Sequence, residues 1–286
     1  MDPNDSVGIL DAYFPEAAFF TEFERFDRHL EKMRRNGAPV DFITICSPNY
    51  LHDAHIRYAL RYGADVICEK PLVLNPWNLD ALREMEQETG RKVWTILQLR
   101  HHPQVIALKN NIAADNSGHI YDVELTYITP RGKWYHASWK GDESKSGGII
   151  TNIGIHLFDM LQWVFGPVLD TAVHLRNHSR AAGTLQFARV RVRWFLSIEA
   201  NTLPPDAGNG PLRTLTLDGQ HRDFSEGFGN LHTESYRHIL DHKGWTLEDA
   251  APSIQLTYDL RHQDITPHGT EAHPSVHLPV KKHPFE

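Results

Sequence analysis

The sequence has little of what marks secreted and membrane proteins. Its 286 residues include 2 cysteines, Cys46 and Cys68, which are too few for a disulfide framework. No apolar run reaches the roughly 18 residues that a membrane-spanning helix needs, and no basic segment leading into an apolar one opens the chain. These absences argue against secretion and membrane contact, and we expect a cytoplasmic protein.

Dense tracts of lysine and arginine are also absent. The formal net charge is -7 with histidines neutral, from 29 Lys and Arg against 36 Asp and Glu. Such a chain is a poor partner for nucleic acid or an anionic membrane, whose phosphates attract basic patches. The G-x-S-x-G elbow of many serine hydrolases does not occur either. We therefore expect a small-molecule ligand and no nucleic acid.

Apolar runs alternate with amphipathic segments in the first part of the chain. Three runs can be buried strands: residues 40–46, 66–68 and 92–97. Between them, residues 50–62 and 77–89 have helical periodicity, and a glycine follows each segment. Strands and helices in this order form βαβ units around a parallel sheet. We predict a doubly wound α/β domain over residues 1–100.

A longer alternation of apolar and polar side chains follows, at residues 119–129 and 172–201. This pattern is typical of an antiparallel sheet with one solvated face. A chain of 286 residues is long enough for two domains, and we place a second, α+β domain over residues 101–266. Residues 267–286 have no periodicity, so we expect a disordered tail.

One of the predicted buried strands ends in a charged pair. Glu69 and Lys70 follow the apolar run directly, and Pro71 stops it because proline donates no ladder hydrogen bond. Open α/β sheets bind their ligands beside the carboxyl ends of the strands. From the dipeptide alone, a solvated surface pair is the alternative. Lys70 is nevertheless the first candidate for chemistry.

A second cluster is predicted on one helix. Residues 150–165 are amphipathic and follow a glycine pair, and Asn152, His156 and Asp159 recur there at spacings of four and three. At these spacings the three side chains share one face of the helix. A histidine in this place can accept a proton, although a histidine alone is more often a hydrogen-bonded part of its helix. Together with Lys70 and the polar turn after the first apolar run, the cluster indicates an active site.

These clusters resemble the Gfo/Idh/MocA oxidoreductases, over a stretch from Asp2 to about residue 253. The resemblance rests on three segments: residues 46–52, 68–71 and 147–159. It implies a Rossmann-like, doubly wound parallel sheet followed by an α+β domain with a large open, mostly antiparallel sheet. Further segments are similar to the UDP-N-acetylglucosaminuronate 3-dehydrogenases of O-antigen synthesis: residues 97–102, 127–135, 138–142, 151–156 and 193–197.

The resemblance implies an activity and its partners. It implies NAD-dependent oxidation of the C3 hydroxyl of a UDP-sugar uronate, UDP-GlcNAcA, to a ketone that a later amino transfer would use. It further implies 2-oxoglutarate as the oxidant that regenerates the cofactor, and a homo-oligomer, a dimer or tetramer, joined through the antiparallel sheet. The alternatives are a remnant that binds a sugar nucleotide or another protein without catalysis, and another sugar dehydrogenase of the same family.

The chemistry of the oxidation requires a base. The base must take the hydroxyl proton within hydrogen-bond reach while the hydride leaves C3, and the candidates are Lys70 and His156. Many family members carry aspartate four residues before the histidine, where this chain has Asn152. An amide can orient the ring but cannot stabilise imidazolium in the same way. We therefore favour Lys70 as base or proton relay, with its pKa lowered by burial, and His156 as orienting partner or alternate base.

The remaining expected site residues follow from the resemblance and from a loop in which cations and aromatic residues alternate. The expected cofactor-binding residues are Asp2, Ser47, Pro48, Asn49, His52, Glu69 and Lys70. The expected substrate-binding residues are Arg100, Arg131, Trp134, Tyr135, Trp139, Lys140, Asn152 and Asp159. Arginine suits a bidentate carboxylate and lysine a phosphate. No metal site is expected.

One element of a dinucleotide site is missing from the sequence. No G-x-G-x-x-G occurs, although in a Rossmann domain the amides of this turn bind the pyrophosphate. In the family the turn precedes an acidic residue at the position of Asp2. About thirty residues of a first βα unit are therefore expected to be missing, judged from the usual spacing between the turn and the acid.

We accordingly expect a polypeptide of this sequence to bind NAD weakly or not at all, because the amides that hold the pyrophosphate are not in it. Titration calorimetry of the purified chain with NAD measures this directly. A micromolar dissociation constant would contradict the expectation.

Overall fold

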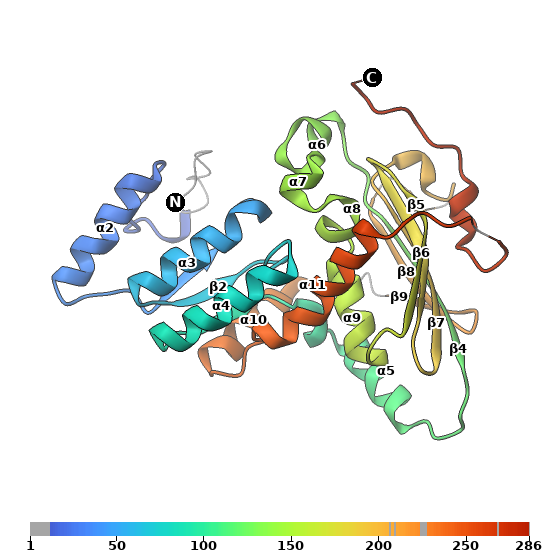
Figure 1. Cartoon of the computed structure of the whole chain (residues 1–286), viewed down its shortest axis with the longest axis horizontal. Coiled ribbons are helices and arrows are strands. Elements are labelled where there is room, and N and C mark those ends of the chain that lie inside the picture. Colours follow the sequence, from blue (N-terminus) through green and yellow to red (C-terminus); the bar gives the residue numbers. More distant parts are fainter. Residues whose placement is uncertain (1–11, 206, 209, 224–227, 268, 286) are drawn as a thin grey trace.

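The chain forms two sheets, and helices lie between them (Figure 1). A computed structural model describes residues 12–205, 207–208, 210–223, 228–267 and 269–285. A three-stranded sheet forms the first part, and a six-stranded sheet forms the second. Among the described residues no helix combines the length and the apolar character needed to cross a membrane.

The first sheet is parallel with strand order β1-β2-β3, which confirms the predicted Rossmann-like α/β class. Its elements in chain order are α2 (Phe23–Arg35), β1 (Phe42–Ile45), η1 (Asn49–Leu51), α3 (His52–Tyr62), β2 (Asp65–Cys68), α4 (Pro76–Thr89), β3 (Val93–Thr95) and η2 (Gln98–His101). The central strand is apolar because helices cover both of its faces, and Val66 pairs with Ile43 and Val93. The predicted helices end at Gly63 and Gly90, both at positive φ.

The second sheet has the order β5-β6-β7-β4-β8-β9 and is mostly antiparallel, as predicted. The exception is the parallel pair of β4 and β7. Its strands are β4 (Tyr121–Ile128), β5 (Asp170–Arg176), β6 (Arg180–Gln186), β7 (Val190–Ser197), β8 (Leu212–Leu217) and β9 (Gln220–Asp223). The α-helices that follow the first sheet along the chain are α5 (Pro103–Ala114), α6 (Lys133–Ala137), α7 (Glu143–Ser146), α8 (Gly148–Asn152), α9 (Ile155–Phe165), α10 (Leu231–Leu240) and α11 (Leu247–His262). Short 3-10 turns lie at η3 (Trp139–Gly141), η4 (Ala200–Thr202), η5 (Phe228–Asn230) and η6 (Pro274–His277).

The single helix predicted over residues 150–165 is two helices in the structure. α8 ends at Asn152 and α9 begins at Ile155. Gly154 lies between the two helices, where the chain packs closely against the sheet. A Cβ at this position would lie only 2.6 Å from Leu196 Cδ1 and 2.5 Å from Ile150 O. The prediction that Asn152, His156 and Asp159 share one helical face is therefore wrong for Asn152, which belongs to the other helix.

Helix α11 crosses the predicted domain boundary. Leu247, Ala250 and Ile254 lie in one hydrophobic cluster with Ile56 and Leu60 of α3. The helix runs between the two sheets in Figure 1. The predicted boundary between residues 1–100 and 101–266 thus separates the two sheets. It does not separate the two hydrophobic cores, because α11, from the second part of the chain, completes the core of the first sheet.

The tail that was predicted to be disordered packs against the six-stranded sheet. Ala272, His273 and Val276 are buried, and the His273 ring stacks on Phe195 with ring centroids 5.4 Å apart. Arg180 Nη1 donates a hydrogen bond to the carbonyl of residue 278 at 2.9 Å. The buried residues are spaced irregularly along the tail, so sequence periodicity could not predict that the tail packs against the sheet.

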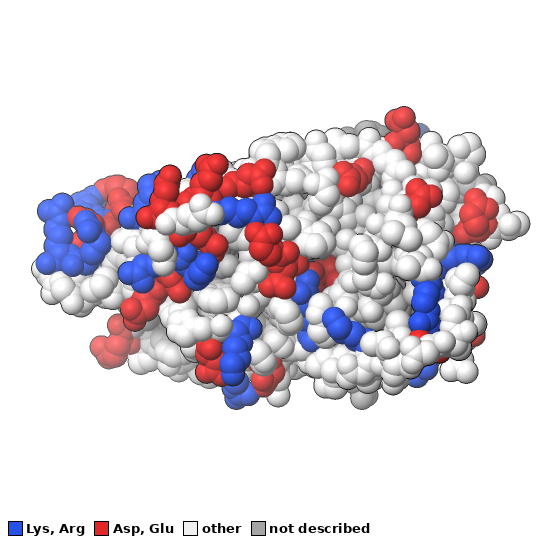
Figure 2. Space-filling view, turned by 60° about the horizontal axis from the view of Figure 1, so that its bottom comes forward, with Lys and Arg blue, Asp and Glu red and all other residues white. Residues whose placement is uncertain are grey.

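Charges of both signs are interspersed on the molecular surface. Figure 2 shows Lys and Arg among Asp and Glu over one end of the molecule, and a broad, mostly uncharged area over the other. The face in view carries no extended basic surface, in keeping with the net charge of -7.

A buried ion pair at the six-stranded sheet allows a test of the fold. Arg180 is 0% exposed and binds the carboxylate of Glu199, which also accepts a hydrogen bond from Ser179. Arg180→Met leaves that carboxylate buried without its cation, so we expect a loss of about 3–5 kcal/mol in the free energy of unfolding. Urea denaturation measures the loss. Arg191→Met, an exposed position on β7, is the control and should change stability by less than about 0.5 kcal/mol; equal effects of the two variants would refute the assignment.

Candidate active site

The carboxyl ends of the three parallel strands bring the predicted catalytic lysine to the junction of the two sheets. β2 ends at Cys68, and Glu69 and Lys70 follow it. The Lys70–Pro71 peptide bond is cis. Lys70 Nζ donates a hydrogen bond of 3.2 Å to the backbone carbonyl of Asn152, at the end of α8. The lysine thus reaches from the first part of the molecule to the helices of the second, where α/β sheets bind ligands.

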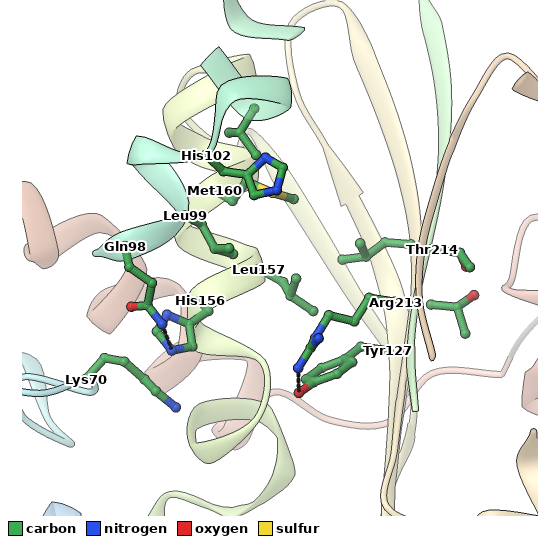
Figure 3. Close-up of a pocket in the computed structure, with 13 residues that line it drawn as sticks. Lys70, Gln98, Leu99, His102, Tyr127, His156, Leu157, Met160, Arg213 and Thr214 are labelled. Atoms are coloured by element: carbon green, nitrogen blue, oxygen red, sulfur yellow. Dashed lines mark hydrogen bonds between the residues drawn. The ribbon is translucent and has the colours of Figure 1, made fainter. Parts of the chain in front are cut away.

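Two cavities meet at this lysine, and both are lined by Lys70, Tyr127 and His156. The first, which we name the cationic cavity, has a volume of about 590 Å³. Its other walls include Arg131, Trp134, Tyr135, Lys140 and Asn152. The second, which we name the apolar cavity, has about 840 Å³ and lies between α5, α9 and the six-stranded sheet (Figure 3). Its apolar walls are Leu99, Val105, Leu125, Leu157 and Met160.

The surroundings of Lys70 favour its neutral form. The pKa of Lys70 is lowered from its ordinary value to about 8, chiefly by burial and also by the positive charges of Lys140 and Arg131, which together outweigh the opposing effect of Glu69. A lysine with this pKa is partly deprotonated near neutral pH. It can therefore accept a proton, which an ordinary lysine cannot do at this pH.

His156 faces the same space from α9 and is held neutral. Burial lowers its pKa well below the ordinary value, and the charge of Lys70 adds to the effect. Gln98 Nε2 lies 3.3 Å from His156 Nε2 and joins the ring to the end of β3 (Figure 3). The histidine thus lies beside the lysine as an uncharged, hydrogen-bonded ring.

Asn152 connects three parts of the site without bonding to the ring of His156. Its Nδ2 donates to the Tyr135 hydroxyl at 2.9 Å, and its Oδ1 accepts from Asn49 Nδ2 at 3.3 Å. Asn49 also donates to the carbonyl of Ser146 at 2.9 Å. Asn152 thus bridges the turn after β1 and the wall of the cationic cavity, and its catalytic role stays a prediction.

The predicted cofactor residues after β1 shape the turn on which they lie. His52 is buried, and its two ring nitrogens lie 2.7 Å from the carbonyl oxygen of Pro71 and 2.8 Å from that of Ser47. The Ser47 hydroxyl bonds to His55 Nδ1 at 2.9 Å, and Pro48 precedes η1. The predicted Asp2 lies outside the described residues. Most of these side chains therefore hold the strand end in place.

The donor set at this edge fits the nicotinamide end of NAD. Glu69 is partly exposed beside Lys70, and its carboxylate lies 3.3 Å from His232 Nε2. The Glu69 carboxylate and the Ser47 hydroxyl both lie at the carboxyl ends of the parallel strands. They are suitable partners for a carboxamide, which both donates and accepts hydrogen bonds. The glycine turn that would hold the pyrophosphate does not occur in the sequence, so the fit concerns the nicotinamide end.

Arg100 and Asp159, which were predicted to bind substrate, bind each other instead. Arg100 Nε and Nη2 donate to the two carboxylate oxygens of Asp159 at 3.0 and 2.8 Å, and Nη1 lies 3.3 Å from Asp249. Both residues of the pair are buried, at 8% and 2% exposure, and neither is among the described residues that line the cationic or the apolar cavity. The predicted Trp139 lies outside the lining too, with its ring 4.9 Å from Lys140 Nζ.

Sequence reasoning missed Gln98, Tyr127 and Arg213 as site residues. Tyr127 and Arg213 face each other on the paired strands β4 and β8, and Arg213 Nη2 donates to the Tyr127 hydroxyl at 3.3 Å. Arg213 follows a loop rich in proline and glycine and belongs to no motif, so only the strand pairing could reveal its place. Gln98 follows the third predicted strand, and its position at a strand end was an available signal.

Comparisons with known proteins agree with this geometry. Residues 2–97 match the family model described as "Oxidoreductase family, NAD-binding Rossmann fold", and residues 105–202 match the GFO/IDH/MocA C-terminal domain. Two crystal structures of the WlbA (WbpB) dehydrogenase of Thermus thermophilus are 46% identical, and each match covers 100% of this chain and 90% of that one. One holds NAD and alpha-ketoglutarate, with a TM-score of 0.90, and the other NAD and UDP-GlcNAcA, with a TM-score of 0.89.

Curated relatives match over shorter stretches. The inositol 2-dehydrogenase of Rhizobium meliloti is 31% identical over 138 residues, which are 48% of this chain and 40% of that enzyme. The chain spans less than half of the length of the first curated relatives it matches, 40% and 46%.

The pKa of Lys70 can be measured without substrate. After reductive methylation with 13C-formaldehyde, we expect one lysine signal in the NMR spectrum to titrate at about pH 8 and to be missing from Lys70→Met. Lys140→Met should raise this pKa because it removes a neighbouring positive charge, and Glu69→Gln should lower it because it removes a negative one. Shifts in the reverse directions would contradict the description of the site.

Proposed function

Because the chain belongs to the Gfo/Idh/MocA oxidoreductase family, we propose that it oxidises the C3 hydroxyl of a UDP-N-acetylhexosaminuronate, UDP-GlcNAcA, to the 3-keto sugar with NAD as cofactor. The observation that carries the proposal is Lys70, a lysine of lowered pKa that lies between a cationic and an apolar cavity. The WlbA dehydrogenase of Thermus thermophilus, which was crystallised with NAD and UDP-GlcNAcA, supports the choice of sugar. When bound, NAD supplies the hydride acceptor.

The cationic cavity suits the anionic parts of such a sugar nucleotide. Arg131 offers a planar fork that matches a carboxylate or phosphate, and Lys140 offers a point charge. Lys140 Nζ lies 5.6 Å from the centre of the Trp134 ring, so the aromatic wall holds the ammonium group toward the cavity. A uronate or diphosphate held here places the remaining sugar hydroxyls near Lys70, because Lys70 lines the same cavity.

Lys70 acts as the base in this proposal. Its neutral amine accepts the proton of the C3 hydroxyl while the backbone carbonyl of Asn152, 3.2 Å away, holds the amine in place. The ammonium that results is stabilised by Glu69, whose charge favours the protonated form. His156 stays uncharged beside it and orients the substrate. The proton can then pass from Lys70 to water.

The wider role is proposed on the same basis. The 3-keto product is a substrate for amino transfer at that carbon, as in the synthesis of a surface polysaccharide. We propose 2-oxoglutarate as the second substrate that reoxidises the cofactor, with its carboxylates on Arg131 and Lys140, because the Thermus thermophilus dehydrogenase was crystallised with alpha-ketoglutarate. We further propose that the protein self-associates through the six-stranded sheet.

The activity is tested by mixing NAD and UDP-GlcNAcA with the purified chain, and with a version completed at its N-terminus by a βα unit that carries the G-x-G-x-x-G turn, and following the absorbance of reduced nicotinamide. We expect turnover by the completed version, at a rate that falls as the pH drops below about 8, because Lys70 becomes protonated. Lys70→Met should lower kcat at least about 100-fold, the usual contribution of a general base. Full hydride transfer by Lys70→Met would refute the role of the lysine.

The choice of substrate has its own control. UDP-N-acetylglucosamine has the same diphosphate but lacks the uronate, so it should be oxidised more slowly than UDP-GlcNAcA. Arg131→Met should raise KM for UDP-GlcNAcA more than it lowers kcat, since it removes binding and not the base. Equal rates with both sugars in the N-terminally completed protein without substitutions would exclude recognition of the uronate.

A further inference from the structure

Gln98 is the residue that contacts the ring of His156. It opens η2 just after β3, so it belongs to the first sheet, whereas His156 belongs to α9 under the second. Gln98 Nε2 and His156 Nε2 are 3.3 Å apart, and both side chains line the apolar cavity beside Lys70 (Figure 3). The contact therefore crosses the junction of the two sheets at the point where the cavities meet.

The chemistry of this contact fixes the protonation of the ring. An amide nitrogen only donates, so His156 Nε2 must accept, and in a neutral imidazole the proton then lies on Nδ1. A ring in this state has no free lone pair to take a proton from the cavity. The charged groups that act on the ring are Lys70, Arg213 and His232, which are cations or potential cations and disfavour a charged ring.

The geometry is held by the neighbouring ion pair. Arg100 comes two residues after Gln98 on η2, and its partner Asp159 comes three residues after His156 on α9. The bidentate contact of 3.0 and 2.8 Å therefore joins the same two elements as the Gln98 contact, about one helical turn away. Because the carboxylate of Asp159 is bound by Arg100, it does not serve as a partner of the ring.

Asn152 does not fill this role either. Its side chain bonds to Tyr135 and Asn49, at 2.9 and 3.3 Å, and its backbone carbonyl accepts from Lys70. The amide of Gln98 is thus the side-chain group that bonds to the His156 ring in the described part of the chain.

We propose that Gln98 is a positioning residue that fixes His156 in its neutral, Nδ1-protonated form and so directs the proton of the substrate hydroxyl to Lys70. The inference rests on the proposed function for the identity of the base and the substrate. The tautomer of His156 does not depend on the proposed function, and it can be measured without cofactor or sugar.

The first experiment reads the tautomer of His156 by 15N NMR of the histidine rings, with its signals assigned by their loss in His156→Asn. We expect Nδ1–H in the unmodified protein and a mixture of tautomers in Gln98→Met, which keeps the size but removes the donor. Gln98→Glu should place the proton on Nε2, because a carboxylate only accepts. An Nε2–H ring in the unmodified protein, or an unchanged ring in Gln98→Met, would overturn the proposal.

The second experiment reads the pH dependence of UDP-GlcNAcA oxidation. Gln98→Glu pairs the ring with a carboxylate, which favours imidazolium, so the rate should acquire a second ionisation between about pH 6 and 7. Gln98→Met should lower kcat about tenfold, the effect of losing one hydrogen bond. Gln104→Glu makes the same change at an exposed glutamine on α5 and should leave kcat within twofold and the pH profile unchanged.

The two experiments separate the possible failures. If the N-terminally completed protein without substitutions does not oxidise UDP-GlcNAcA, the proposed function fails and the NMR measurement still decides the role of Gln98. If the protein is active and Gln98→Glu keeps the pH profile of Gln104→Glu, the proposal about Gln98 fails and the proposed function stands.

Discussion

The buried pair of Arg100 and Asp159 is the interaction on which the site depends. It joins the end of β3 to α9, and Asp249 at the start of α11 adds a second carboxylate to the same guanidinium. Loss of one member would leave the other charge buried alone, which usually costs about 3–5 kcal/mol, so the junction resists any shift that separates the pair. The Rossmann-like sheet carries Lys70 and Gln98, and α9 carries His156. The ion pair keeps these residues in one place although they come from different sheets.

Charge then determines what the assembled residues can do. Arg131 and Lys140 make the cationic cavity attractive to an anion and also lower the pKa of Lys70. A bound carboxylate or phosphate would offset those two positive charges and raise the pKa of Lys70 again. The lysine is therefore most readily neutral before the anion binds, and most able to hold a proton once the anion is present. Binding of the substrate would thus assist the transfer of its own proton.

Local patterns predicted much of the architecture, and contacts distant in sequence supplied the rest. The strand that ends at Lys70 and the cations near Arg131 are visible in the sequence because apolar runs, glycines and charges lie side by side. The break at Gly154 has no such sign, since it follows from the approach of Leu196 on a distant strand. Arg100 was expected to face a ligand from its place at a strand end and Asp159 from its helical spacing, whereas the structure buries the two as a pair. Periodicity could not show the packing of the tail.

Asn152 illustrates how the residue type at one position determines which hydrogen bonds it makes. Many members of the family carry aspartate here, and a carboxylate can only accept hydrogen bonds when ionised. In this chain the amide uses both of its functions, since it donates to Tyr135 at 2.9 Å and accepts from Asn49 at 3.3 Å. A group committed in this way cannot also charge the histidine of the next helix. The ring of His156 must then be held from elsewhere, and the strand end that the Arg100 ion pair already fixes is the element that brings a suitable donor, Gln98, within reach.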